Sequence, residues 1–269
     1  MAQRLLEINR TFYAQHGHNF SETRQRLQPG VQRLMGTLSA DQAVMDLGCG
    51  NGGLARALSL RSHRAPYLGV DFSPSLLEAA RRDAHAMPAR FVLADILQIS
   101  KLTYPEWASP PNAFPAPLQS PAVQGFASTA GRWPVIAAFA VLHHIPSRNC
   151  RLQLLGTVWT WLQPDGRLFM SNWQFLSNQR LRARTQPWSA AGLSAAEVDP
   201  NDYLLDWRHG PVGLRYVHQF DEAELRDLAT SSGFNIVETF YADGSNRHSG
   251  LYQVWMRAPR PAKVLKRNR

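Results

Sequence analysis

One pattern recurs between residues 43 and 172. A short apolar run ends at an acidic or glycine-rich turn, and a stretch with helical spacing of apolar residues often follows it. The apolar runs cover residues 43–47, 66–70, 90–93, 135–139 and 167–172. Strands that alternate with helices pair in parallel through crossover connections, with helices on both faces of the sheet. The pattern therefore predicts an α/β fold with a mainly parallel sheet.

The flanking segments extend this core. After a predicted helix over 222–232, stopped by Gly233, two strand-like runs at 234–241 and 251–256 bring the expected sheet to seven strands. We expect one domain over residues 1–258 and a basic tail over 259–269. Within the domain we expect three additions: an N-terminal helical extension over 1–40, a proline-rich insertion over 103–134, and an inserted cap over 174–219, where no clear strand pattern is present.

Charge and composition narrow the class of protein. The net charge is +9, but residues 257–269 contribute six basic side chains and no acid, so residues 1–256 carry only +3. A basic tail fits either phosphate binding or a solubilising terminus. No apolar run approaches the roughly 20 residues that span a bilayer. The N-terminus lacks a signal-like apolar stretch, which predicts a cytoplasmic protein with no membrane partner.

The cysteines and histidines do not indicate a metal site. Cys49 and Cys150 are the only cysteines, which excludes a disulfide framework and a zinc site built mainly on thiolates. His16 and His18 lie close together, but no cluster of carboxylates or thiols accompanies them. We therefore predict that no metal is bound.

The richest motif joins the first predicted strand to the first predicted helix. It reads Asp46-Leu47-Gly48-Cys49-Gly50-Asn51-Gly52-Gly53. Glycines let the backbone approach a ligand, and main-chain N–H groups at a helix start can hold an anion. Asp71 and Asp95 end the next two strands, where they can accept hydrogen bonds from ribose hydroxyls and from an exocyclic adenine amine. Three acids at three successive strands fit one nucleoside-bearing ligand.

Four segments, DLGCGNG, GVDFS, LADIL and FAVLHHI, resemble the motifs of class I S-adenosylmethionine-dependent methyltransferases. The resemblance covers residues 44–172 in the expected order and implies a Rossmann-like sheet with S-adenosylmethionine as cofactor. By resemblance, the glycines contact the methionine part, Asp71 the ribose, Asp95 the adenine, and residues 139–143 the sulfonium side. The expected cofactor-binding residues are Asp46, Gly48, Cys49, Gly50, Gly52, Asp71, Phe72, Ser73, Ala94, Asp95, Ile96, Phe139 and His143.

A narrower resemblance appears near both ends of the chain. The segments NFSETR, LHHIP, RYVHQF and GSN are similar to the tRNA methyltransferases of the AlkB homologue 8 methyltransferase-domain type. These enzymes esterify 5-carboxymethyluridine at the wobble position. The resemblance implies tRNA as substrate and, by analogy with eukaryotic relatives, a small zinc-binding activator protein, for which the chain itself gives no signal.

A carboxylate acceptor needs positioning rather than a general base, because it is already ionised at pH 7. Candidates for this catalytic role are Arg24, His144, Asn172, Arg215 and His218. Each also has a structural interpretation: it can pair with an opposite charge, cap a helix, or lie on the solvent-exposed face of a strand. With an amine or phenol substrate, His143 or His144 would become a candidate general base.

Two other functions remain open. A small-molecule O- or N-methyltransferase would enclose a small acceptor beneath the 174–219 cap. A non-catalytic protein that binds S-adenosylmethionine would fit two departures from the family pattern. The fourth strand opens with Arg132-Trp133-Pro134 instead of an acid, and Arg247 follows Gly-Ser-Asn where an aromatic residue is common.

Overall fold

The structure, a computed structural model, describes residues 1–22, 26–83, 87–99, 133–208 and 213–258. Arg24 and the basic tail over 259–269 lie outside these ranges. So does the proline-rich insertion over 103–134, except for its last two residues, which belong to a strand of the main sheet.

Seven strands form the main sheet, in the order β3-β2-β1-β4-β5-β10-β9. Strands β1 to β5 run parallel to one another, and β10 is antiparallel to both β5 and β9. The predicted seven-stranded, mainly parallel α/β sheet is confirmed. The strands are β1 (Val44–Leu47), β2 (Tyr67–Asp71), β3 (Ala89–Leu93), β4 (Trp133–Phe139), β5 (Leu162–Trp173), β9 (Phe234–Ala242) and β10 (Gly250–Arg257).

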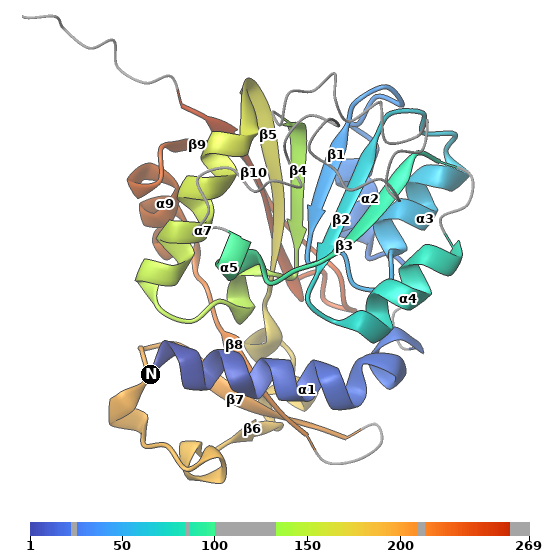
Figure 1. The fold of residues 1–269 in the computed structure, drawn as a ribbon. Helices are drawn as coiled ribbons and strands as arrows, with labels where there is room; N and C mark the ends of the chain where they lie inside the picture. Colours follow the sequence, from blue (N-terminus) through green and yellow to red (C-terminus); the bar gives the residue numbers. More distant parts are fainter. Residues whose placement is uncertain (23–25, 84–86, 100–132, 209–212, 259–269) are drawn as a thin grey trace, which may run out of the picture.

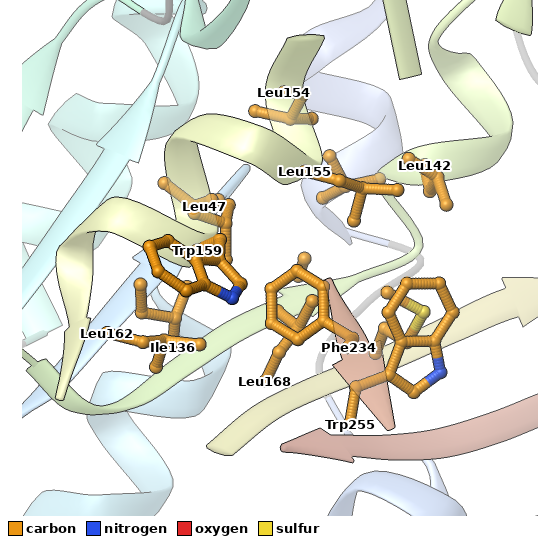
Figure 2. Close-up of a cluster of buried hydrophobic side chains, with 14 of the residues drawn as sticks. Leu47, Ile136, Leu142, Leu154, Leu155, Trp159, Leu162, Leu168, Phe234 and Trp255 are labelled. Carbon is orange, nitrogen blue, oxygen red and sulfur yellow. The ribbon is translucent and has the colours of Figure 1, made fainter. Parts of the chain in front are cut away.

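Helices cover both faces of this sheet because successive strand residues point to opposite sides. Val44 packs in a cluster with α2 (Pro29–Met35) and α3 (Gly53–Leu60), whereas Met45 packs with α7 (Arg148–Trp161) and α9 (Glu222–Ser231). Figure 2 shows the second cluster, where Trp159 of α7 and Trp255 of β10 flank Phe234. The remaining helices alongside the sheet are α4 (Pro74–Asp83) and α5 (Ile96–Ile99).

Residues 174–219, where the sequence showed no clear strand pattern, contain a second sheet of three antiparallel strands. Buried polar residues such as Asp202, Arg215 and His218 interrupt the apolar alternation that identifies a strand in sequence. The elements are η5 (Phe175–Ser177), α8 (Gln179–Arg182), β6 (Thr185–Gln186), η6 (Trp188–Ala191), η7 (Ala195–Glu197), β7 (Asp202–Trp207) and β8 (Gly213–His218).

The N-terminal helix α1 (Ala2–Glu22) packs against this second sheet and runs past the end of the main sheet (Figure 1). Asn9 Oδ1 accepts a hydrogen bond from the Tyr216 N–H of β8 at 2.9 Å. Phe12 meets Trp207 of β7 edge to face, with ring centroids 5.5 Å apart. Polar side chains of α1 are thereby held in the space between the two sheets. No helix in the described ranges is long and apolar enough to cross a membrane.

A buried ionic cluster joins the second sheet to α7 and α9. Asp202 Oδ1 accepts hydrogen bonds from Tyr216 Oη at 2.7 Å and from His218 Nδ1 at 2.6 Å. Arg151 donates to Glu224 at 3.1 Å and to Tyr216 Oη at 3.2 Å, and His218 Nε2 contacts Glu224 at 2.9 Å. Two cations and two carboxylates balance when His218 is protonated, which makes this cluster a stable junction.

His218 is expected to make stability depend on pH. Burial is the largest influence and disfavours its charge, but hydrogen bonds to Asp202 and Glu224 outweigh burial and raise the pKa above 6.5. A raised histidine pKa stabilises fully below about pH 6.5, and the contribution disappears as pH rises through the folded-state pKa. His218→Gln should therefore cost about 3 kcal/mol near pH 6 and less at pH 9. Urea unfolding of both proteins across this range measures the difference, and a gap that widens with pH would contradict the assignment.

Candidate functional site

A cavity of about 600 Å³ opens at the carboxyl ends of β1, β2, β4 and β5, with α1 and the second sheet beside it. In open parallel sheets, ligands bind where the strand order reverses, which here is between β1 and β4. The volume is within the range of small-molecule and cofactor sites. The cavity therefore lies at the position where the sequence motifs converge.

The glycine turn after β1 forms the floor of the cavity. Gly48, Gly50 and Gly52 have φ values of +67°, +53° and +73°, a region that residues with a side chain seldom adopt. A Cβ on Gly48 would lie 2.6 Å from Val141 Cγ2, and one on Gly52 would lie 2.8 Å from Ala80. A Cβ on Gly50 would meet nothing within 4 Å. Gly50 thus leaves room for a ligand, whereas Gly48 and Gly52 allow the turn to pack.

This difference separates two alanine substitutions. Gly50→Ala should cost only about 1–2 kcal/mol of stability, the penalty of a left-handed backbone, but should weaken ligand binding at least tenfold because its methyl group enters the space left above the turn. Gly48→Ala should cost more stability, because it also displaces the buried Val141. Thermal unfolding with and without ligand measures both effects, and equal ligand affinity of Gly50→Ala and the parent chain would refute the role of Gly50.

Asp71 lies at the end of β2 and supports the glycine turn directly. Its Oδ2 accepts the Gly50 N–H at 2.9 Å, and its Oδ1 accepts the Ser73 N–H at 2.8 Å. Burial raises the pKa of Asp71, while these backbone hydrogen bonds oppose that rise. A carboxylate has about four acceptor positions, so Asp71 can still accept bonds from a ligand.

Asp46 lies in β1, buried, and also lines the cavity. It accepts a hydrogen bond from Tyr67 Oη at 2.6 Å. Burial is the main cause that raises the pKa of Asp46 to about 7, with Asp71 adding to it and Tyr67 opposing. A cationic group of a ligand placed beside Asp46 would favour its charged form and lower that pKa.

Asp95, just after β3, reaches the cavity from the other side of the turn. Its Oδ1 accepts the Leu97 N–H at 2.8 Å, and its Oδ2 bonds to the guanidinium of Arg10 on α1. The sequence placed Asp95 beside an adenine but gave no sign of Arg10. The carboxylate again has acceptor positions left for a ligand amine.

His143 is buried at the far end of the cavity, in the 3-10 turn η4 (Leu142–His144). Its Nδ1 accepts the Trp173 N–H at 3.2 Å, which places the proton of the neutral ring on Nε2. Burial, followed by nearby His144, Arg215 and His218, holds the pKa of His143 well below its usual value. The neutral ring with a protonated Nε2 is suited to donate a hydrogen bond and unsuited to act as a general base through Nε2.

His144 joins three parts of the chain at the cavity wall. Its Nδ1 lies 3.1 Å from the Tyr216 carbonyl oxygen of β8, and its Nε2 lies 3.3 Å from Tyr13 Oη of α1. Donation from Nδ1 to the carbonyl leaves Nε2 to accept from the tyrosine hydroxyl. His144 therefore links η4 to α1 and β8 at the cavity wall.

Arg215 of β8 brings a buried positive charge to the same end. Its guanidinium carbon lies 4.9 Å from the ring centroid of Trp173 and 5.3 Å from that of Phe12. The faces of aromatic rings attract a cation placed over them. Asn172, at the end of β5, is buried and lines the cavity close to His143.

Most predicted site residues come together in this cavity. Its lining includes Asp46, Gly48, Cys49, Gly50, Asp71, Phe72, Asp95, Ile96, Phe139, His143, His144, Asn172 and Arg215. Gly52 packs beneath the turn, and Ser73 and Ala94 line a shallower neighbouring pocket. Arg24 lies outside the described residues.

The expectation for His218 needs correction. It does not line the cavity in the described structure, and both ring nitrogens contact carboxylates in the ionic cluster. The reason is strand alternation: Arg215 and His218 lie three residues apart on β8, so they point to opposite faces. His218 stabilises the second sheet and is withdrawn as a candidate for acceptor contact.

Several lining residues were missed in the sequence. They are Asn9, Arg10 and Tyr13 of α1, together with Asp243 and Tyr252 near the C-terminus. Their spacing resembles that of ordinary surface or strand positions, so only the docking of α1 and β10 reveals them. Within the described ranges, no three histidine, cysteine or acidic side chains are placed to hold a metal ion.

Comparison with known proteins gives a consistent result. A family model described as "Methyltransferase domain" matches residues 20–239. The chain is 24% identical over 229 residues to a methyltransferase-like protein of Encephalitozoon cuniculi, an alignment covering 84% of this chain and 87% of that protein. It is also 24% identical over 244 residues to the tRNA (carboxymethyluridine(34)-5-O)-methyltransferase of Schizosaccharomyces pombe, covering 83% and 86%.

Solved structures share the fold. The 1,6-didemethyltoxoflavin-N1-methyltransferase of Burkholderia thailandensis, solved with its substrate and S-adenosylhomocysteine, superposes with a TM-score of 0.60. The match covers 96% of this chain and 91% of that one at 17% identity. At this identity the similarity establishes the architecture alone.

Proposed function

The chain belongs to the methyltransferase domain family, and from this premise we propose that it transfers a methyl group from S-adenosylmethionine to a carboxylate on tRNA. The acceptor we propose is the carboxymethyl group of a wobble uridine. The observation that carries the proposal is the buried, aromatic-flanked Arg215 beside the donor residue His143 at one end of the cavity.

The cavity suits S-adenosylmethionine along its whole length. Gly50 leaves open space above the turn, Asp71 offers acceptor positions for ribose hydroxyls, and Asp95 offers one for the adenine amine. Asp46 is placed for the ammonium of the methionine part, which would draw it into its charged form. When bound, this cofactor would supply a sulfonium methyl group: the acceptor oxygen would bond to the methyl carbon as the carbon–sulfur bond breaks, and S-adenosylhomocysteine would leave as a neutral thioether.

The residues at the acceptor end match an anionic nucleophile. The Arg215 guanidinium and the His143 Nε2–H are both hydrogen-bond donors, and the Asn172 amide lines the same cavity. A carboxylate needs no proton removed, so the absence of a free basic nitrogen on His143 is no obstacle. Orientation of the carboxylate oxygen is then the main contribution of the protein.

The choice of tRNA as acceptor rests on similarity to a relative named for a tRNA substrate. The Schizosaccharomyces pombe relative, named for methylation of carboxymethyluridine at position 34 of tRNA, aligns along most of both chains. The LHHIP and RYVHQF segments supply His143, His144 and Arg215 to one cavity. Gly244 of the GSN segment lines the same cavity.

The test is direct. Purified protein is incubated with isotopically methyl-labelled S-adenosylmethionine and tRNA that carries unmethylated carboxymethyluridine, and the digested nucleosides are analysed by mass spectrometry. Label in the methyl ester of carboxymethyluridine is the expected result. Cofactor binding with label only on a small amine or phenol would replace the proposal with a small-molecule methyltransferase. Binding without any labelled product, even with the zinc-binding activator of a eukaryotic relative added, would indicate a non-catalytic binder.

A further inference from the structure

Four exposed basic side chains lie on two segments that border the cavity. Arg180 and Arg182 belong to α8, and Arg247 and His248 to the turn between β9 and β10. We call these four residues the arginine patch. They come from segments about 65 residues apart in the chain, so the sequence alone does not group them.

Hydrogen bonds hold the two segments together. Ser177 Oγ donates to the His248 carbonyl oxygen at 3.1 Å, and Asn246 Nδ2 donates to the Ser177 carbonyl oxygen at 3.4 Å. Gln174 N–H donates to the Ser249 carbonyl oxygen at 2.9 Å. Asn178 then caps α8 through the N–H groups of Arg180 and Leu181. These hydrogen bonds fix the two segments that carry the patch relative to each other.

The patch adjoins the cavity directly. Leu181, between the two α8 arginines, lines the cavity, as do Gly244 and Ser249 at the two ends of the turn. A polymer bound at the patch would therefore lie next to the cavity.

No acid neutralises the patch from within. Residues 174–184 and 244–250 contain no aspartate or glutamate. The neighbouring Asp243 already accepts bonds from the Gly30 N–H and Tyr252 Oη. Tyr241 stacks on His248, with ring centroids 5.2 Å apart, and donates its hydroxyl to Glu222. Glu222 therefore lies at the edge of the patch.

From this arrangement we propose that the arginine patch binds the phosphate backbone of RNA and delivers the base to be modified into the cavity. Planar guanidinium groups recognise phosphate oxygens with two hydrogen bonds each, and exposed aromatic pairs offer a stacking face to an unpaired base. The inference rests on the proposed function for its choice of RNA, and it adds where the polymer lies.

The experiment measures tRNA binding by fluorescence anisotropy at several salt concentrations. The test variant is Arg180→Gln/Arg182→Gln/Arg247→Gln in the full chain. The control is Arg61→Gln/Arg82→Gln/Arg226→Gln, which removes the same charge from exposed positions on α9 and on the ends of α3 and α4 away from the cavity. Calorimetry with S-adenosylmethionine checks that both variants keep the cofactor site.

The test variant should bind tRNA about 10- to 100-fold more weakly, and its slope of log K against log salt should fall by about two to three. The control should change affinity less than threefold. Equal loss in both variants, or an unchanged test variant, would overturn the patch. If the test variant lost affinity for polyglutamate or anionic vesicles but still bound tRNA like the parent chain, the proposal would also be overturned. The assay measures tRNA binding and not methyl transfer. An error in the proposed methyl acceptor would therefore not change the result for the patch.

Discussion

Replacing Arg215 by glutamine is expected to lower kcat/KM for the carboxylate acceptor about 100- to 1,000-fold, the range seen when one preorganised electrostatic donor is lost. The guanidinium lies against the Trp173 and Phe12 rings, where little water screens it. Glutamine keeps a donor but removes the charge that attracts and orients an anion. Steady-state kinetics with labelled S-adenosylmethionine measures the loss.

Two comparisons keep this prediction specific. Arg208→Gln removes an exposed arginine that pairs with Asp206 on β7, and it should leave the rate unchanged. Arg215→Lys retains the charge without the planar fork and should recover part of the rate. Affinity for S-adenosylmethionine should stay within about threefold in all three variants. A full rate with Arg215→Gln at unchanged cofactor affinity would remove Arg215 from the acceptor site.

Asp71→Asn should weaken S-adenosylmethionine binding about 100- to 1,000-fold. The carboxylate accepts the Gly50 and Ser73 N–H groups, and an asparagine amide can accept one of them but must turn its own N–H₂ toward the other. The substitution therefore disturbs the glycine turn and weakens the bonds to the ribose hydroxyls. Each hydrogen bond to a charged group contributes about 1.5–3 kcal/mol, and 1.4 kcal/mol is a factor of ten in affinity.

Calorimetric titration with S-adenosylmethionine measures this effect directly. Asp41→Asn is a suitable control, because Asp41 pairs with Arg64 on the surface and takes no part in the turn. The control should bind the cofactor like the parent chain. An Asp71→Asn affinity within about threefold of the parent would show that Asp71 does not contact the ligand.

Local sequence patterns were enough to predict the main architecture. The apolar runs before Gly48, Asp71 and Asp95 became β1, β2 and β3, since a strand followed by a turn and a helix has a short-range signature. The same patterns failed over residues 174–219. There Asp202 and His218 occupy buried strand positions, and their partners Arg151 and Glu224 come from α7 and α9. Burial of charge depends on those distant partners, which no local window contains.

Arg215 and His218, both predicted as site residues and both on β8, show what the tertiary structure adds to the sequence. The sequence by itself determined the fold class and the glycine turn with its acids. The structure alone places Arg215 and His218 on one strand, three residues apart, so that they face opposite sides. Only the docking of α1, α7 and α9 decided that Arg215 faces the cavity and His218 the ionic cluster. Alternation is a property of the local backbone, whereas the choice of face is made by long-range packing, which matches each buried charge to a partner.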